Sequence, residues 1–252
     1  MFTTEAWQEW FGTLEALEIR LWGADTVECN ASTMQGYGTA IQNLDKDMLT
    51  PGRNIREFRF VASEHGPIGP TGTTNSSCPM PFSETSLPKL VELQLENIAL
   101  GPTFLTLINH LGGTLRILTF HNVKAGAQRS FDDDDATVNW AEVWDHVRTT
   151  NISLVELAVS YSKVAPLTDA EWDGLHSEVR TPPPDEEDRI KRLREMLRRE
   201  PDKFIWPYVS YGIEHGDHSP QASVNADRLE TGDDWAAYDL LQKEVRERRK
   251  LN

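Results

Sequence analysis

One short pattern occurs twice in close succession, as LVELQLEN at residues 90–97 and LRILTFHN at residues 115–122. In both stretches apolar residues occupy positions 1, 4 and 6, and an asparagine occupies position 8. Apolar residues at alternate positions predict a short strand that buries one face and exposes the other. The two stretches therefore predict repeated strands rather than one isolated strand.

The same spacing of apolar residues occurs in three further windows, so that the five windows begin at Leu14, Ile55, Leu90, Leu115 and Leu154. Apolar residues at helical spacing lie before the first window and near residues 34–48, 104–111 and 140–147, which predicts amphipathic helices there. Alternating strands and helices predict an α/β fold. We interpret it as a leucine-rich-repeat-like solenoid, a curved parallel sheet backed by helices, with an ordinary α/β domain as the alternative.

The composition suggests two regions. Residues 1–180 are predicted to form the array, with long insertions near 61–86 and 124–139, where Gly, Pro, Ser, Thr or Asp dominate. Residues 181–252 are predicted to form a helical cap, because RIKRLREMLRRE (189–200) and DDWAAYDLLQKEVRERRK (233–250) have helical periodicity. The alternative for this tail is a partner-binding arm.

Four stretches resemble the leucine-rich-repeat region of fungal F-box-type proteins: LPKLVELQLENIAL (87–100), GGTLRILTFHNV (112–123), WAEVWDHV (140–147) and ISLVELAVS (152–160). The resemblance covers roughly residues 5–165. It implies the substrate-recognition half of a ubiquitin-ligase receptor. The segment before Leu14 is too short for the helical F-box that docks the ligase adaptor, so this chain is either a receptor half alone or lacks its N-terminus.

Charge and composition limit the partners. The chain has 252 residues, 38% of them hydrophobic, and a formal net charge of −15, which excludes a nucleic-acid binder and an anionic lipid surface and favours a protein partner with a basic surface. There is no signal peptide pattern and no run of 18 apolar residues, so we expect no membrane span. With only two cysteines, a reducing location in the cytoplasm or nucleus is expected.

Few residues indicate chemistry. EHGDH at 214–218 is the best metal-like cluster, and it leaves a metal-assisted hydrolase that uses His215 and His218 as the alternative function. A short polar turn is the simpler interpretation, and no nucleophile elbow occurs. We therefore predict a non-enzymatic protein-interaction module with no cofactor, no metal ligand and no catalytic residue.

The windows also predict where a partner binds. In a parallel solenoid the residues beside the second and third apolar positions point to one concave face, and equivalent positions form rows about 4.8 Å apart. The first row would contain Ala16, Glu57, Glu92, Ile117 and Glu156. The alternative is a solvated acidic sheet without a partner. The candidate protein-binding residues are Glu18, Arg20, Glu57, Arg59, Glu92, Gln94, Glu96, Thr119, His121 and Glu156.

Overall fold

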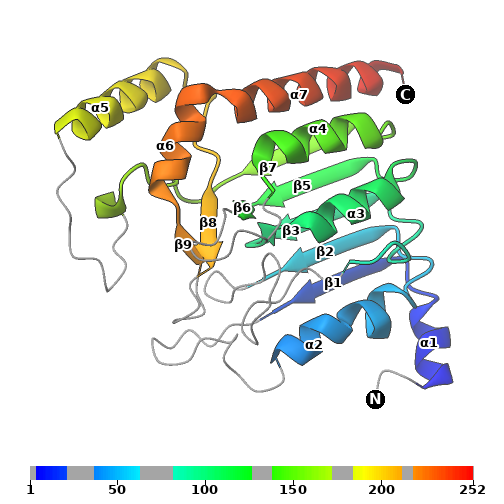
Figure 1. Ribbon diagram of the computed structural model, residues 1–252. Helices are drawn as coiled ribbons and strands as arrows, with labels where there is room; N and C mark the ends of the chain where they lie inside the picture. The colour runs from blue at the N-terminus through cyan, green and yellow to red at the C-terminus, as the bar shows by residue number, and fades with distance from the viewer. Residues whose placement is uncertain are drawn as a thin grey trace.

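Five parallel strands form the main sheet of the computed structural model, which describes residues 4–21, 37–62, 82–126, 138–171, 184–211 and 218–251 (Figure 1). Each strand lies in one of the five sequence windows. The α/β fold with a parallel sheet is therefore confirmed. In spatial order the strands are β1 (Ala16–Arg20), β2 (Glu57–Val61), β3 (Glu92–Glu96), β5 (Ile117–His121) and β7 (Glu156–Ser160).

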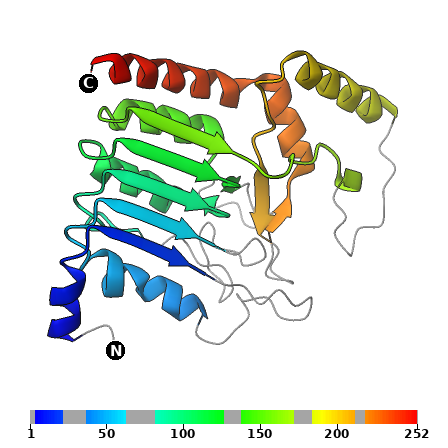
Figure 2. The ribbon, with the colours of Figure 1, turned by 180° about the vertical axis from the view of Figure 1, so that it is seen from behind.

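Helices cover one face of this sheet, as the two opposite views show (Figures 1 and 2). The three helices of this layer are α2 (Tyr37–Leu44), which continues into a π-helical turn (Asp45–Leu49), α3 (Pro102–Leu111) and α4 (Trp140–Thr150). A shorter helix, α1 (Glu5–Phe11), precedes β1. Each helix coincides with a predicted apolar stripe, because the stripe is what packs against the sheet.

The core lies between these two layers. The side chains of β2, β3 and β5 that face the helices, such as Phe58, Leu93 and Leu118, have at most 1% of their surface exposed. The layers also meet closely at the helix ends. α3 stops before Gly112, where a Cβ atom would lie 2.5 Å from the carbonyl oxygen of Thr150, so only glycine fits there without displacing the end of α4.

A second, smaller sheet lies beyond the C-terminal ends of the main strands. It consists of β4 (Ala99–Leu100), β6 (Lys124–Gly126), β8 (Tyr208–Tyr211) and β9 (His218–Pro220), in that order, and only β9 is antiparallel. The composition predicted an insertion near residues 124–139 and a helical cap at residues 181–252. The structure differs in placing β6 in the first region and β8 and β9 in the second, because strands of three or four residues carry too little periodicity to be recognised.

The C-terminal region packs onto the rest of the chain. A 3₁₀ turn (Asp169–Glu171) precedes α5 (Pro184–Arg199), α6 (Ala222–Thr231) and α7 (Asp233–Leu251). Gly232, with φ of 74°, joins α6 to α7 in a left-handed conformation that suits glycine. α7 lies along α4 and contacts the edge strand β7, and Trp206 and Tyr208 enter the main core. No helix in the described part of the chain is both long and apolar enough to cross a membrane.

Candidate protein-binding face

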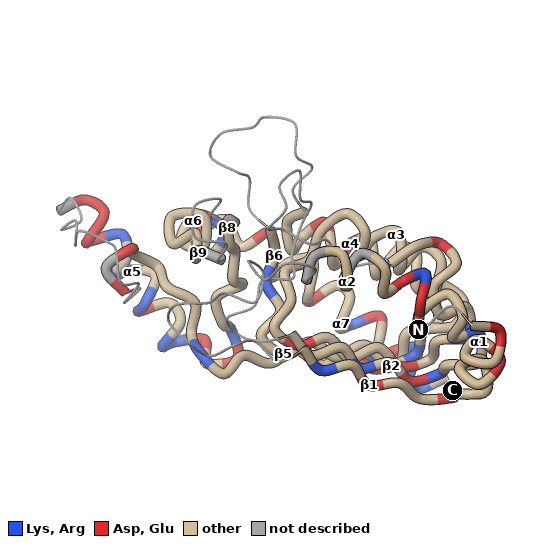
Figure 3. Tube along the Cα trace, turned by 90° about the horizontal axis from the view of Figure 1, so that it is seen from below, with Lys and Arg blue, Asp and Glu red and all other residues tan. Residues whose placement is uncertain are grey.

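The face of the main sheet opposite the helices, which we call the open face, is not covered by any helix or strand in the described part of the chain (Figure 2). Figure 3 shows the helix layer and the strand layer as two levels, with acidic and basic residues along the strands. In β2, β3 and β5 buried residues alternate with residues that are exposed or half-buried. The latter form the open face, as the pleat requires.

The strand register arranges the open face in three rows. The first row contains Ala16, Glu57, Glu92, Ile117 and Glu156, which pair in sequence across the four strand contacts. The register therefore agrees with the rows expected from the sequence. It brings together all ten candidate residues, and the remaining two rows are Glu18, Arg59, Gln94, Thr119 and Ala158, and Arg20, Val61, Glu96, His121 and Ser160.

Arg59 links three strands on the open face. Its Nη2 lies 3.0 Å from a carboxylate oxygen of Glu96, and its Nη1 lies 3.8 Å from Glu18, which also contacts Arg20. The side chains of Glu18, Arg20 and Glu96 keep 21–51% of their surface exposed. Each of these ion pairs therefore contributes at most about 1 kcal/mol to stability. Both arginines of the open face are thus already engaged by carboxylates of the same chain.

Three other glutamates of the open face have no such partner. Glu57, Glu92 and Glu156 take part in no ion pair or side-chain hydrogen bond within the described residues. Glu57 and Glu92 are direct neighbours on adjacent strands, where like charges are mildly destabilising. The first row therefore carries negative charge that no described residue neutralises, and we call Glu57, Glu92 and Glu156 the acidic row.

An asparagine ladder closes the C-terminal ends of the strands, a feature the sequence analysis did not predict. Asn97 Nδ2 donates to the Ala62 carbonyl at 3.0 Å, and Asn122 Nδ2 donates to Asn97 Oδ1 at 3.2 Å. Asn122 Oδ1 accepts from the backbone N–H of Ser162 at 2.7 Å. Both asparagines have positive φ, 57° and 52°, which asparagine tolerates better than most residues. The sequence feature that could have predicted this ladder is the asparagine at position 8 of both eight-residue stretches.

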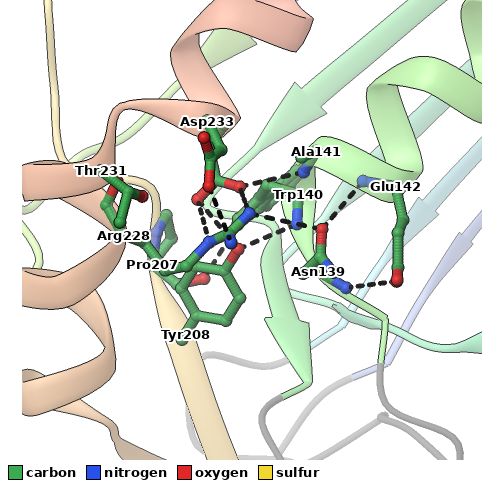
Figure 4. Close-up of polar contacts among 10 residues, drawn as sticks. Asn139, Trp140, Ala141, Glu142, Pro207, Tyr208, Arg228, Thr231 and Asp233 are labelled. Carbon is green, nitrogen blue, oxygen red and sulfur yellow. Dashed lines mark hydrogen bonds and ion pairs between the residues drawn. The ribbon is translucent and has the colours of Figure 1, made fainter.

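A buried polar network joins the C-terminal region to α4 (Figure 4). Asp234, only 1% exposed, accepts hydrogen bonds from the Ala141 backbone N–H (3.0 Å) and the Tyr208 hydroxyl (2.9 Å), and contacts Arg228. The same hydroxyl accepts from the Trp140 backbone N–H at 2.9 Å. Burial raises the pKa of Tyr208 well above its ordinary value, so the phenol stays protonated. The network satisfies free N–H groups at the start of α4 and serves as a structural joint.

The metal-like cluster EHGDH lies almost entirely outside the described residues. Residues 212–217, which include His215, lie outside the described residues, and only the backbone of His218 is described, at the start of β9. Within the described part of the chain, no group of three His, Cys, Asp or Glu residues could hold a metal ion.

Comparisons with known proteins add no functional assignment. No protein-family model, curated protein or solved structure matches the chain. The open face is therefore the feature from which a function can be proposed.

Proposed function

We propose that this chain is a non-enzymatic protein-binding module with a leucine-rich-repeat-like architecture, similar to the substrate-recognition half of an F-box-type ubiquitin-ligase receptor. The observation that carries the proposal is the open face, where polar side chains of five strands stand in three registered rows. A sheet face of this kind offers a broad surface to a protein and no enclosed pocket to a small substrate.

The order of elements supports a repeating unit. A strand, an asparagine turn, a short strand and a helix follow one another twice, first as β3, Asn97, β4 and α3, and then as β5, Asn122, β6 and α4. The asparagine ladder connects the two units through side-chain amides. Because neither a five-residue strand nor its helix can bury an apolar face alone, stacking such units is a physically favourable way to form a core.

The acidic row suggests the chemistry of the partner. Glu57 and Glu92 are unneutralised neighbours, and Glu156 lies in the same row on the other side of Ile117. A lysine or arginine of a partner would relieve the repulsion between these carboxylates. We therefore propose a protein partner with a basic surface, whose association weakens as salt concentration rises.

The test starts from a library of random peptides selected for binding to the wild-type protein. Lys and Arg should be enriched in the selected sequences. Replacement of Glu57, Glu92 and Glu156 together by glutamine should weaken binding of a selected peptide by about tenfold or more and flatten its salt dependence. Calorimetric or fluorescence titrations at several salt concentrations would measure both effects.

A matched control separates local contact from net charge. Glu9, Glu84 and Glu247 are exposed and lie outside the open face, so their triple replacement by glutamine changes the net charge equally. We expect this control to bind the peptide nearly as the wild type does. Equal losses in both triple variants, or none in either, would contradict binding at the acidic row.

A further inference from the structure

The outer edge of β1 presents unpaired backbone groups. In the parallel pairing with β2, the Glu15 carbonyl accepts from the N–H groups of Arg56 and Glu57, and the Leu21 N–H donates to the Val61 carbonyl. Hydrogen-bonded residues alternate along a parallel strand, so the odd-numbered residues of β1 face β2. The N–H and carbonyl groups of Ala16, Glu18 and Arg20 consequently point away from the sheet. Within the described residues they have no backbone partner.

The apolar side chains of this edge are also incompletely covered. Leu17 and Ile19 are half-buried and pack against the core from its periphery. The residues that pair with them on β2, Phe58 and Phe60, are at most 1% exposed. An additional strand beside β1 would bury this apolar surface and satisfy the outward backbone groups.

The sequence of β1 is self-complementary in one antiparallel register. If Ile19 of two copies meet at a twofold axis, Leu17 of each copy lies opposite Leu21 of the other on the helix side. On the open face, Glu18 of each copy lies opposite Arg20 of the other. Glu18 and Arg20 are outward-facing residues, so each of the two symmetry-related Glu18–Arg20 pairs can exchange both of its backbone hydrogen bonds. This register therefore forms backbone hydrogen bonds, pairs opposite charges and buries apolar side chains at the same time.

We infer that two copies of this chain associate edge to edge through β1 and form one continuous sheet across a twofold axis. The charge pattern selects the register, because the two neighbouring antiparallel registers that pair outward-facing residues would place Glu18 opposite Glu18 in one case and Arg20 opposite Arg20 in the other. Charged residues can also protect an edge strand from pairing. Here the opposite charges at positions 18 and 20 instead match between the two copies. The inference is independent of the proposed function, since the acidic row is not part of this edge.

Two single charge reversals test this pairing. Glu18→Arg places arginines at both positions, and Arg20→Glu places glutamates at both, so each variant alone opposes like charges. The wild type should show a concentration-dependent dimer in sedimentation velocity. Each variant alone should dissociate with a constant at least about tenfold higher. An equimolar mixture of the two variants should form a heterodimer, because Arg then faces Glu at every position.

A backbone variant tests the hydrogen bonds separately. Glu18→Pro removes an outward N–H that the monomer does not use, and proline is tolerated at such positions of edge strands. We expect a folded monomer, with circular dichroism and thermal unfolding close to those of the wild type. If the wild type stays monomeric over the whole concentration range, the inference is wrong. It is equally wrong if the variants dimerise like the wild type, or if the mixed variants remain apart while each is folded.

Discussion

The two ends of the main sheet are finished differently. At the β7 end, α7 packs along α4, Gln242 donates to the Leu157 carbonyl at 3.3 Å, and Arg248 donates to the Asn151 carbonyl at 2.7 Å. At the β1 end, the described residues place no strand or helix against the outward backbone groups of Ala16, Glu18 and Arg20. One end of the sheet is thus capped by its own chain, and the other has no such cap among the described residues.

The two ends also differ in how much aromatic surface they bury. The β7 end is held by a cluster of aromatic residues, in which Trp144 lies 5.0 Å from Trp140, 5.1 Å from Trp206 and 5.3 Å from Tyr238 between ring centroids. Such pairs add to the free energy gained by burying the rings. We expect most of the folding free energy to be concentrated there, and substitutions at the two ends should differ accordingly.

The largest expected effect comes from the aromatic cluster. Trp144 is fully buried, so Trp144→Ala should leave a cavity and lower the free energy of unfolding by about 3–5 kcal/mol. Trp10, on α1 near the β1 end, is 54% exposed, and Trp10→Ala should cost less than about 1 kcal/mol. Urea denaturation of both variants would measure the difference. Similar losses would show that the β7 end is not the more stable part.

The next effect concerns the network at the start of α4. Asp234→Ala removes the acceptor of Ala141 and Tyr208 and the buried partner of Arg228, so we expect a loss of about 2–3 kcal/mol in the free energy of unfolding. Asp233 is 61% exposed and lies 3.6 Å from Arg228, which makes Asp233→Ala the matched control, with a loss below about 1 kcal/mol. Equal losses in thermal unfolding would contradict a structural role for the buried carboxylate.

A smaller effect is expected in the asparagine ladder, between the two ends. Asn122→Ala removes the hydrogen bonds to Asn97 and Ser162 and puts at a positive φ a residue that tolerates this conformation less well than asparagine, which together should cost about 2 kcal/mol. Asn122→Gly removes the same hydrogen bonds but tolerates the backbone conformation. The difference between the two variants in chemical denaturation isolates the backbone strain. If glycine is as destabilising as alanine, the ladder itself carries the effect.

Local periodicity explains which features could be predicted from the sequence. The apolar residues at positions 1, 4 and 6 gave the five strands and their register, because burial alternates within each strand independently of distant residues. The contact of Arg59 with Glu18 could also be predicted from the sequence, since both residues lie in one predicted row. The network around Asp234 was not, because it joins residues 93 positions apart whose proximity depends on the packing of α7 against α4.

The smallest expected effect tests the cap on β7 directly. Gln242→Ala removes the hydrogen bond to the Leu157 carbonyl and the one to the Tyr238 hydroxyl, so the free energy of unfolding should fall by about 1 kcal/mol. Asp239→Ala, an exposed change on the same helix, serves as the control.

Hydrogen exchange gives the sharper measurement at this edge. The N–H groups of Leu157 and Val159 point outward from β7 towards α7, because the Leu157 carbonyl on the same side is bound by Gln242. In dilute monomeric protein they should exchange more slowly than the outward N–H groups of Glu18 and Arg20, which have no described cover. Gln242→Ala should narrow this difference without changing exchange in β3. Equal exchange rates at the two edges of the wild-type monomer would mean that α7 does not shield β7, and the contrast between the capped end and the open end would then be lost.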